Sequence, residues 1–482
     1  MNQFMGNFVS NTALVFNYLI LFYAIGISLN YVLLAALSAI AMRSYKKKNS
    51  FVDYRTILSS PNAPSVSLIA PAYNESMTIV DNVRSLLTLH YNNCEIIIVN
   101  DGSKDNTLAL LIEAYELEKV NMVLDERVAT KAVRGIYKAK NPAYHKLVVV
   151  DKENGGKADA LNVGINVSSN QLIACIDVDC VLEQDAILKL VKPFMEEDRK
   201  VIATGGVIRI ANSCIVEDGR LVKVKVPESF IARVQVLEYF RAFLMGRMAW
   251  AKVDGLLLIS GAFGMFDKET VIRAGGYNHN TVGEDMELLV RMRRLMYEEK
   301  QPCKVAFIPD PLCWTEAPQT WNILKRQRNR WTRGTAETLW IHRKMIFNRK
   351  YGIHGMLSLP LWVLFEWAAP LIEFFGLLFF LFIMLLGYAN WLYFFSFFAL
   401  VYTFAIMNSV FAILFEERSY QQYKKPRFML SLVLTALLEP LIYHPVTVWA
   451  AILGNRDLMT GKKSWGEMTR TGFAQKAKEA SA

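Results

Sequence analysis

The sequence predicts an α/β domain, built on a mostly parallel sheet, that lies between N-terminal and C-terminal transmembrane helices. Apolar runs of strand length alternate with helical segments between residues 65 and 176, which is typical of a parallel sheet covered on both faces. Residues 8–42 carry almost no charge, and three more apolar stretches follow residue 353. Stretches of about 20 or more apolar residues are long enough to cross a bilayer.

The composition favours a basic membrane protein. Of the 482 residues, 53% are hydrophobic and 12% aromatic, and the mean hydropathy is above zero. The net charge of +10 fits a chain that faces anionic lipid. The sequence has no zinc-ligand spacing and no RNA-binding signature, so we expect no nucleic-acid partner. The six cysteines form no C-x-x-C pair, and we expect them to be reduced and cytosolic.

Residues 1–48 form the predicted N-terminal transmembrane segment. A signal peptide would need positive charge before its apolar core, which residues 1–10 lack, and this core is too long. Basic residues follow the segment at Arg43 and at positions 46–48. The positive-inside rule therefore places the next domain, residues 60–317, in the cytosol. We expect a multi-pass protein of the inner or plasma membrane.

Residues 354–454 are predicted to hold the C-terminal transmembrane or re-entrant segments. The apolar stretches are residues 354–386, 391–415 and 428–453. The basic segment 416–427 and the basic tail 455–482 are both expected inside, which conflicts with a single crossing by residues 428–453. Pro440 and Pro445 therefore leave a re-entrant hairpin or an interfacial piece open. We expect no regulatory domain after this stretch.

Charged side chains interrupt these apolar segments. Glu366, Glu373, Glu439 and His444 either line a polar pathway or reach water at helix ends. Residues 234–252 have helical spacing, with three charged residues interleaved, and lie against the membrane or against the domain core.

The first half of the domain alternates strands and helices. Strands are expected at residues 65–70, 94–99, 147–150 and 171–176, and helices at residues 77–90 and 108–120. Polar clusters follow three of the strands, at positions 74–75, 101–105 and 177–179. Ligands of open parallel sheets bind beyond the carboxyl ends of the strands, so these clusters predict the site.

Asp177 and Asp179 are candidate metal ligands. They follow an apolar strand, and residues i and i+2 of an extended backbone point the same way. Paired carboxylates suit Mg²⁺ or Mn²⁺ shared with substrate phosphates. The alternative is an ordinary turn, because Asp is common after strands.

Lys157 follows Gly155 and Gly156 at the start of a predicted helix. Exposed backbone N–H groups and a helix start favour anions, and Lys157 adds a full charge, so this segment suits a pyrophosphate. The P-loop spacing is absent. An ordinary glycine-containing turn is the alternative.

The second half of the domain contains a small-residue turn and a pair of acidic residues that are further candidates for the site. Ser260 and Gly261 belong to a small-residue turn that allows close approach of a ligand. Glu284 and Asp285 begin a helix. Acids there are ordinary capping chemistry, or Asp285 is a general base within reach of an acceptor hydroxyl.

Residues 318–347 form a predicted basic, tryptophan-rich interfacial helix. Gln327, Arg330 and Trp331 are three and four residues apart, so they share one helix face. Tryptophan and basic residues are typical of a helix at headgroup depth. We expect this helix to lie on the membrane with that face turned to the site.

Together these motifs resemble family 2 of the inverting glycosyltransferases, in particular the membrane-integrated group of cellulose, hyaluronan, chitin and poly-N-acetylglucosamine synthases. The resemblance covers residues 65–331. The motifs stand in one order: Pro71-Ala72-Tyr73-Asn74-Glu75, Asn100-Asp101-Gly102-Ser103, Gly155-Gly156-Lys157-Ala158, Asp177-Val178-Asp179, Gly283-Glu284-Asp285 and Gln327-Arg328-Asn329-Arg330-Trp331.

The resemblance implies a Rossmann-like GT-A fold, a UDP-sugar donor and a Mg²⁺ or Mn²⁺ cofactor. It implies these roles: Asp285 and Glu284 catalytic; Tyr73, Glu75, Asp101, Lys157, Asp177 and Arg330 in UDP-sugar binding; Ser260, Gly261, Gln327 and Trp331 in acceptor binding; Asp179 and Asp177 as metal ligands. Two departures stand out, because the common T-E-D is G-E-D here and Asn100 replaces a frequent Asp.

The function implied is transfer of a hexosyl or N-acetylhexosaminyl group to a glycan acceptor, as a processive exopolysaccharide synthase. A single-addition transferase with a lipid acceptor is the alternative, and a catalytically inactive membrane scaffold is the third reading. A partner subunit for secretion stays open.

Overall fold

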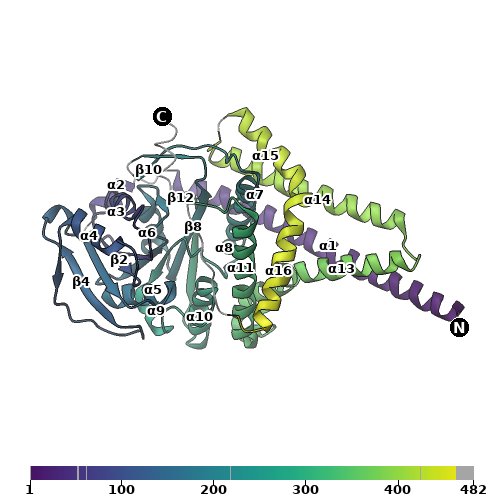
Figure 1. Cartoon of the computed structure of the whole chain (residues 1–482), viewed down its shortest axis with the longest axis horizontal. Coiled ribbons are helices and arrows are strands. Elements are labelled where there is room, and N and C mark those ends of the chain that lie inside the picture. The colour runs from purple at the N-terminus through teal and green to yellow at the C-terminus, as the bar shows by residue number, and fades with distance from the viewer. Residues whose placement is uncertain (1, 51–53, 61, 218, 424, 463–482) are drawn as a thin grey trace.

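The computed structural model describes residues 2–50, 54–60, 62–217, 219–423 and 425–462, so most of the predicted basic tail lies outside the described residues. The chain forms an α/β domain from which a bundle of long helices extends (Figure 1). The short helix α2 (Tyr54–Ser59) joins the first long helix, α1 (Asn2–Asn49), to this domain.

Within the described residues, ten strands form one mixed sheet in the order β3-β4-β5-β2-β1-β6-β11-β8-β12-β7. The strands are β1 (Val66–Ala72), β2 (Cys94–Asn100), β3 (Leu117–Val120), β4 (Val133–Ala139), β5 (Leu147–Lys152), β6 (Leu172–Ile176), β7 (Val181–Leu182), β8 (Lys200–Ile210), β11 (Phe263–Asp267) and β12 (Cys303–Thr315). A separate ribbon pairs β9 (Ile215–Glu217) with β10 (Arg220–Lys223). The neighbours β5, β2, β1 and β6 are all parallel, which confirms the predicted α/β domain.

Helices cover both faces of the sheet because each central strand is apolar on both sides. Leu68 and Ala70 of β1 pack under α3 (Ile79–Leu87), α4 (Thr107–Tyr115) and α6 (Ala186–Glu196). Ile69, between them, faces α5 (Lys157–Val167), α9 (Lys268–Arg273) and α10 (Glu284–Glu298). Successive side chains of a strand alternate between faces, so one run of apolar residues packs into the hydrophobic cores on both faces of the sheet.

The expected helix over residues 108–120 is wrong at its end. The helix α4 stops at Tyr115, because Glu116 adopts a left-handed conformation with φ 51°. Residues Leu117–Val120 then form β3, which pairs antiparallel with β4. A non-glycine residue with positive φ ends a helix, and the spacing of apolar residues in the sequence does not predict where that happens.

Three helical segments lie between the domain and the bundle. The first consists of α7 (Phe230–Tyr239), the π-helical segment η2 (Phe240–Arg247) and α8 (Met248–Lys252). The helix α11 (Trp321–Ile341) lies next to α10 and α16 (His444–Met459). Short 3-10 turns lie at η1 (Pro142–Tyr144), η3 (Arg343–Met345) and η4 (Arg349–Tyr351).

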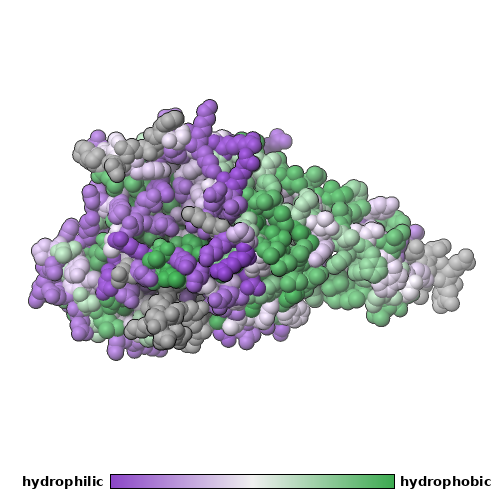
Figure 2. Space-filling view, turned by 90° about the horizontal axis from the view of Figure 1, so that it is seen from above, coloured by the Kyte–Doolittle hydropathy of each residue, from purple (hydrophilic) through white to green (hydrophobic). Residues whose placement is uncertain are grey.

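The bundle consists of α1, α13 (Ala369–Leu385) and α14 (Trp391–Ser419), which extend away from the domain in Figure 1. Ring contacts join them, as between Phe16 and Phe379. The Tyr393 hydroxyl also donates to the Asn17 carbonyl at 2.7 Å. Figure 2 shows hydrophobic residues gathered over this half of the molecule and hydrophilic ones over the other. An apolar surface of this extent is typical of a lipid-facing bundle.

Three helical stretches within the described residues are long and apolar enough to cross a membrane: Asn11–Asn49, Trp391–Ser419 and Pro426–Met459. A fourth counts if the pair His354–Trp367 and Ala369–Leu385, bent by 40°, is one span. The first half of that pair includes η5 (His354–Ser358), α12 (Leu359–Trp362) and η6 (Val363–Trp367).

The last stretch, residues 426–459, ends in a helix that differs in direction from the bundle helices. It consists of α15 (Pro426–Leu438), the π-helical segment η7 (Glu439–Tyr443) and α16. In Figure 1 α16 runs across the direction of α13, next to the domain. It packs along α11, where the Asn329 amide donates to Asp457 at 3.0 Å and Gly454 lies against the Asn329 carbonyl.

Candidate functional site

A cavity of about 970 Å³ lies between the α/β domain and the helix bundle. Its domain side is formed by the end of β6, the turn before β11, the start of α10 and one face of α11. Its bundle side is formed by residues of α1, η6, α13, α14 and α16. The cavity therefore continues from the carboxyl edge of the sheet into the helical region.

Most of the predicted site residues line this cavity. They are Lys157, Asp177, Ser260, Gly261, Glu284, Asp285, Gln327, Arg330 and Trp331. Tyr73, Glu75, Asp101 and Asp179 are not among the residues that line it. The structure thus brings nine of the thirteen predicted residues, from five separate stretches of sequence, to one cavity.

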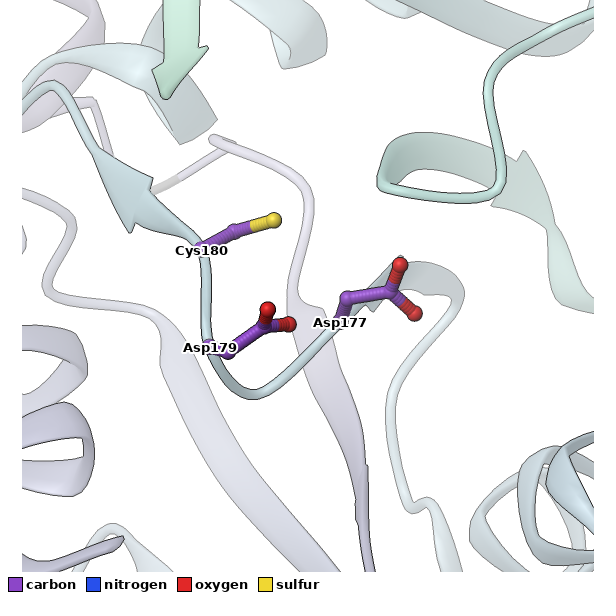
Figure 3. A group of neighbouring side chains, drawn as sticks. All are labelled: Asp177, Asp179 and Cys180. Atoms are coloured by element: carbon purple, nitrogen blue, oxygen red, sulfur yellow. The ribbon is translucent and has the colours of Figure 1, made fainter. Parts of the chain in front are cut away.

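Asp177 and Asp179 lie in a turn rather than at the end of an extended strand. The strand β6 ends at Ile176, and the Cys180 N–H donates to the Asp177 carbonyl at 3.0 Å. Figure 3 shows the Asp179 carboxylate turned toward Asp177, whose own carboxylate extends beyond it, away from Asp179.

The carboxylates of Asp177 and Asp179 still fit a divalent cation. One ligand atom from each of Asp177, Asp179 and Cys180 lies within 4.8 Å of the others. Two carboxylates are the donor set that Mg²⁺ and Mn²⁺ accept, whereas a thiol is a soft donor. The neighbouring Cys313 thiol, followed by burial, raises the pKa of Cys180 well above its ordinary value, so this thiol stays protonated.

Lys157 is the first residue of α5 and joins the two halves of the site. Its ammonium donates to the Gly261 carbonyl at 3.0 Å and forms an ion pair with Asp177. The Glu284 carboxylate lies 4.0 Å away. Burial alone would lower the pKa of Lys157, but Asp177 and Glu284 outweigh it and raise the pKa. Lys157 therefore stays charged over the physiological range.

Asp285 lies in the first turn of α10 with its carboxylate at the cavity. One oxygen accepts from the Gly261 N–H at 2.9 Å and the other from the Met286 N–H at 2.8 Å. These two backbone donors fix the carboxylate's orientation, so the predicted acid and the predicted acceptor-side turn are in direct contact.

Glu284 is nearly buried, with 4% of its surface exposed. Burial raises the pKa of its carboxyl, the neighbouring Asp285 adds to the rise, and Lys157 and Arg330 oppose it. Lys157 and Arg330 are therefore close enough to Glu284 to interact with its carboxylate electrostatically. The start of α10 and the face of α11 meet at this point.

The helix α11 presents its predicted face to the cavity. Gln327, Arg330 and Trp331 all line it. The neighbouring Arg328 stacks on the Trp331 ring at 4.2 Å and donates to Glu238 at 2.6 Å. This ion pair ties α11 to α7 beneath the cavity.

Asp101 is committed to the protein itself. Its carboxylate accepts from Lys152 at 2.6 Å, from the Gly155 and Gly156 N–H groups at 2.9 and 2.8 Å, and from the Asn154 amide at 3.2 Å. The glycine N–H groups that we expected to meet a pyrophosphate are therefore already bound. The Asp101 carboxylate, rather than a bound anion, accepts the hydrogen bonds of these two N–H groups.

Tyr73 and Glu75 lie beyond the end of β1, beside Asp101. The Asp101 N–H donates to the Ala72 carbonyl at 2.9 Å, and the Glu75 N–H donates to the Thr107 hydroxyl at 2.9 Å. Tyr73 is 44% exposed. This corner offers an exposed aromatic ring next to a fixed loop.

Arg247 is a cavity residue whose role the sequence did not indicate. It lies in η2, its guanidinium stacks on the Phe243 ring at 3.8 Å, and one of its buried nitrogens has no hydrogen-bond partner. Burial lowers its pKa to about 10, and Asp285 acts in the opposite direction. A charged residue inside the apolar helical stretch 234–252 was the only signal in the sequence.

The bundle side of the cavity is aromatic with a few polar groups. It includes Trp362 and Trp367, with Glu366 between them in chain order, together with Asn408 and His444. The Trp367 indole donates to Asn455 at 2.9 Å, which joins η6 to α16. Two of the four charged or titratable groups that the sequence placed in apolar stretches thus line the cavity.

Two family models match the chain. The model for glycosyl transferase family 2 matches residues 67–214, and the model for glycosyl transferase family group 2 matches residues 172–408. Together they include the whole cavity lining on the domain side and reach into α14.

Curated relatives include poly-β-1,6-N-acetyl-D-glucosamine synthases. The protein of Staphylococcus epidermidis is 30% identical over 275 residues, and that of Staphylococcus aureus (strain COL) is 30% identical over 277 residues. Each match covers 57% of this chain and 55% of the relative, so the chain spans about half the length of these relatives.

Solved structures with a related arrangement include a mannosyltransferase from Pyrobaculum calidifontis, in complex with GDP-mannose and Mn²⁺, with a TM-score of 0.47 and 16% identity over 91% of this chain and 100% of that chain. Another is a glucosyl-3-phosphoglycerate synthase from Mycobacterium tuberculosis, with a TM-score of 0.35 and 14% identity over 59% of this chain and 82% of that chain. Because the family models match contiguous and overlapping parts of the chain, and the curated relatives are glycan synthases, the chain belongs to the family 2 glycosyltransferases.

Proposed function

We propose that this glycosyltransferase transfers a hexosyl or N-acetylhexosaminyl group from a UDP-sugar to a glycan acceptor with inversion, as a processive exopolysaccharide synthase. The carrying observation is the single cavity that holds Lys157, Asp285 and Arg330 and continues between the helices of the bundle. The similarity to poly-β-1,6-N-acetyl-D-glucosamine synthases supports N-acetylglucosamine as the first donor sugar to test. The proposed catalytic domain is residues 60–317, with residues 318–347 as its interfacial helix.

Asp285 is the proposed general base. A general base needs a carboxylate within hydrogen-bond reach of the acceptor hydroxyl, and Asp285 borders the cavity. The Gly261 and Met286 N–H groups hold it in one orientation. In this role Asp285 takes the hydroxyl proton as the acceptor oxygen bonds to the anomeric carbon, and the bond from that carbon to the UDP oxygen breaks on the opposite face. Glu284, directly beside it, completes the proposed catalytic pair.

Lys157 and Arg330 are proposed to bind the diphosphate with Asp177. Negative charge develops on UDP as it leaves, and fixed cationic groups stabilise that charge. Asp179 and Asp177 would hold Mg²⁺ or Mn²⁺, which when bound supplies further positive charge at the phosphates. The Lys157 and Asp177 ion pair must then loosen, because both partners face the same diphosphate.

The nucleoside is assigned to the corner formed by Tyr73, Glu75 and Asp101. The exposed Tyr73 ring offers a stacking surface. The carboxylate of Asp101 already accepts four hydrogen bonds from residues 152–156. We therefore assign it an indirect contribution to uracil binding, through the position of that segment.

The acceptor is assigned to Ser260, Gly261, Gln327 and Trp331 and to the aromatic bundle side of the cavity. Sugar rings have apolar faces and polar edges, and a cavity that combines indole rings with a few polar groups suits both. A growing glycan would lie along this direction, which supports processive synthesis.

A single addition to a lipid acceptor is the second candidate. The observation that favours it is the same opening between membrane helices, since Tyr31, Pro370 and Asn408 come from the three helices of the bundle. Both candidates place the protein in the inner or plasma membrane with the catalytic domain in the cytosol. A secretion partner subunit is an added proposal for the processive case.

The test uses the purified full chain in detergent. UDP release is measured with UDP-N-acetylglucosamine, UDP-glucose and UDP-glucuronate, each with Mg²⁺, with Mn²⁺ and with a chelator, and radiolabelled products are sized. Metal-dependent release with a high-mass product, cut by a linkage-specific hydrolase, supports the synthase. One lipid-soluble product of a single size supports the second candidate, and no release from any donor refutes both.

A further inference from the structure

Two glycines lie against each other where α10 begins beside α11. Gly283 is the residue before α10, and Gly334 lies in the middle of α11. A Cβ added to Gly283 would lie 2.7 Å from the Gly334 Cα and 2.9 Å from the Gly334 carbonyl oxygen. The reverse substitution meets the Gly283 Cα at 2.7 Å. The neighbouring atoms are backbone, so neither side can yield without moving a helix.

Glu337, one turn after Gly334, binds the segment that leads into α10. Its carboxylate accepts from the Thr281 hydroxyl at 2.7 Å and from the Val282 N–H at 2.9 Å. The Thr281 hydroxyl in turn accepts from the Gly283 N–H at 3.1 Å. The hydrogen bonds from residues 281 and 282 to Glu337 therefore hold the segment before α10 against α11, next to the contact between the glycines.

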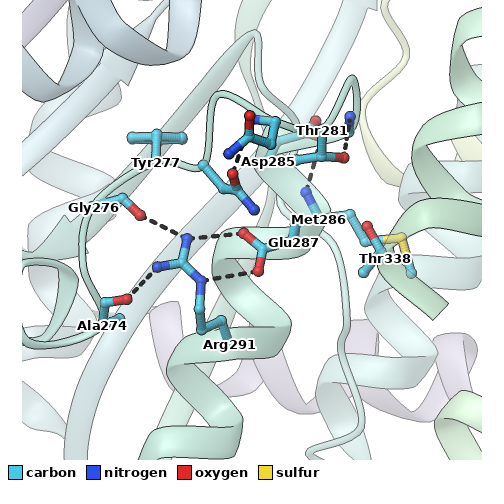
Figure 4. A network of polar contacts seen from close by, with 12 residues as sticks. Ala274, Gly276, Tyr277, Thr281, Asp285, Met286, Glu287, Arg291 and Thr338 are labelled. Atoms are coloured by element: carbon cyan, nitrogen blue, oxygen red, sulfur yellow. Dashed lines mark hydrogen bonds and ion pairs between the residues drawn. The ribbon is translucent and has the colours of Figure 1, made fainter. Parts of the chain in front are cut away.

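A second link lies about one turn after Gly283 on α10 and about two turns after Gly334, at the end of α11. Glu287 of α10 accepts from His342 at 3.2 Å and from Arg291 at 2.8 and 2.9 Å. Arg291 also donates to the Gly276 carbonyl at 2.7 Å and to the Ala274 carbonyl (Figure 4). This network fixes the loop before α10 as well as the helix itself.

The contact lies next to the reacting groups. Asp285 is two residues after Gly283, and Arg330 is four residues before Gly334 on the same face of α11. Any increase in the distance between the glycines moves the base away from the cation that is assigned to the leaving group. A displacement of about 1 Å between catalytic groups can lower a rate by about 100-fold.

We propose that the contact between Gly283 and Gly334, held by Glu337, is a positioning device that sets the distance between Asp285 and Arg330. This inference rests on the proposed function, in which those two side chains act on opposite sides of one sugar. It also accounts for G-E-D in place of T-E-D, because the β-branched side chain of a threonine at position 283 would overlap the backbone of Gly334.

The first experiment replaces each glycine in the full chain. Gly283→Ala and Gly334→Ala are each expected to lower kcat about 10- to 100-fold. The double variant is expected to lose less than the product of the two single losses, because one added methyl already separates the helices. Gly26→Ala is the matched control, since its Cβ would make an ordinary contact of 3.6 Å with Phe365.

The second experiment separates positioning from a general loss of stability. Glu337→Gln keeps a carbonyl oxygen that accepts from Thr281 and Val282, so it is expected to retain activity within about 3-fold. Glu337→Ala removes both acceptors and is expected to lose at least about 10-fold. Folded protein is verified by the thermal midpoint and by elution as one species.

The outcomes distinguish this inference from the proposed function. If Gly283→Ala is folded and turns over at the rate of the unmodified chain, the positioning device is refuted. Equal losses in Glu337→Gln and Glu337→Ala would refute the role of Glu337. If Asp285→Asn keeps full activity, the proposed base is wrong, whatever the glycine variants do.

Discussion

At the scale of single residues, charge decides how the site is built. Lys157, at the start of α5, pairs with Asp177 and lies 4.0 Å from Glu284, and the Glu284 carboxyl also interacts with Arg330 of α11. Asp101 shows the opposite case, since four donors from residues 152–156, one of them the Lys152 ammonium, bind its carboxylate. The motif residues could be predicted from the sequence, but this difference could not, because it depends on which donors the folded loop brings to each carboxylate.

Glu284 makes stability depend on pH. Its pKa is raised above 4.5 in the folded chain, so its contribution to stability is fully present below that value and is lost as the pH rises through the raised pKa. We expect Glu284→Gln to raise the thermal midpoint at pH 7.5 by about 2–4 °C and to leave it nearly unchanged at pH 4.5. Differential scanning fluorimetry at both pH values measures this. A variant that is less stable at pH 7.5 would contradict it.

Asp179 is expected to determine metal affinity. Removal of one carboxylate from a site with two should weaken Mn²⁺ binding in the presence of UDP by about 10- to 100-fold, which is a typical loss when a metal site is disturbed. Asp179→Asn is compared with Asp185→Asn, whose carboxylate pairs with Lys189 at the start of α6. Electron paramagnetic resonance of free Mn²⁺ reports the affinity directly. Equal affinities in the two variants would remove Asp179 from the metal site.

At the scale of elements, the parallel strands could be predicted because both of their faces are buried. Residues 96–99 read as one apolar run, and each of their side chains is at most 2% exposed. The strand β12 was missed, since Pro309 and Pro311 interrupt it and the pairing with β8 shifts register at both. Proline is excluded from regular central strands, so only the register shift lets the strand continue.

The stretch of residues 426–459 belongs to the same scale. We expect α15 and α16 to lie along the membrane surface rather than to cross it, because α16 packs along α11 and runs across the direction of α13. This arrangement keeps residues 416–427 and the tail on one side. It removes the conflict between the two basic flanks and the positive-inside rule.

Labelling of Lys462→Cys in intact cells tests this orientation. An impermeant maleimide is expected to leave position 462 unlabelled from outside and to label Tyr388→Cys, which lies in the turn between α13 and α14 and is 45% exposed. The unmodified chain, with its native cysteines, is the control. Labelling of position 462 from outside would mean that residues 426–459 cross the membrane once.

At the scale of the whole molecule, the cavity is the feature that joins the α/β domain to the helix bundle. Its walls come from residues as distant in sequence as Leu34, Lys157, Arg247 and Ala451. The sequence could identify both halves, the sheet edge with its motifs and the apolar helices. It could not predict that they share one cavity, because that requires the packing of η2 and α11 between them. Arg247 was missed for the same reason.

The account depends most on Asp285 as the base that faces the diphosphate across one sugar. Its most direct test is metal-dependent UDP release by Asp285→Asn in the full chain, measured together with the affinity for UDP. We expect turnover to fall by about 100- to 10,000-fold while the Kd for UDP stays within about 3-fold of the unmodified value. Turnover at the unmodified rate, in a variant that binds UDP normally, would contradict the account.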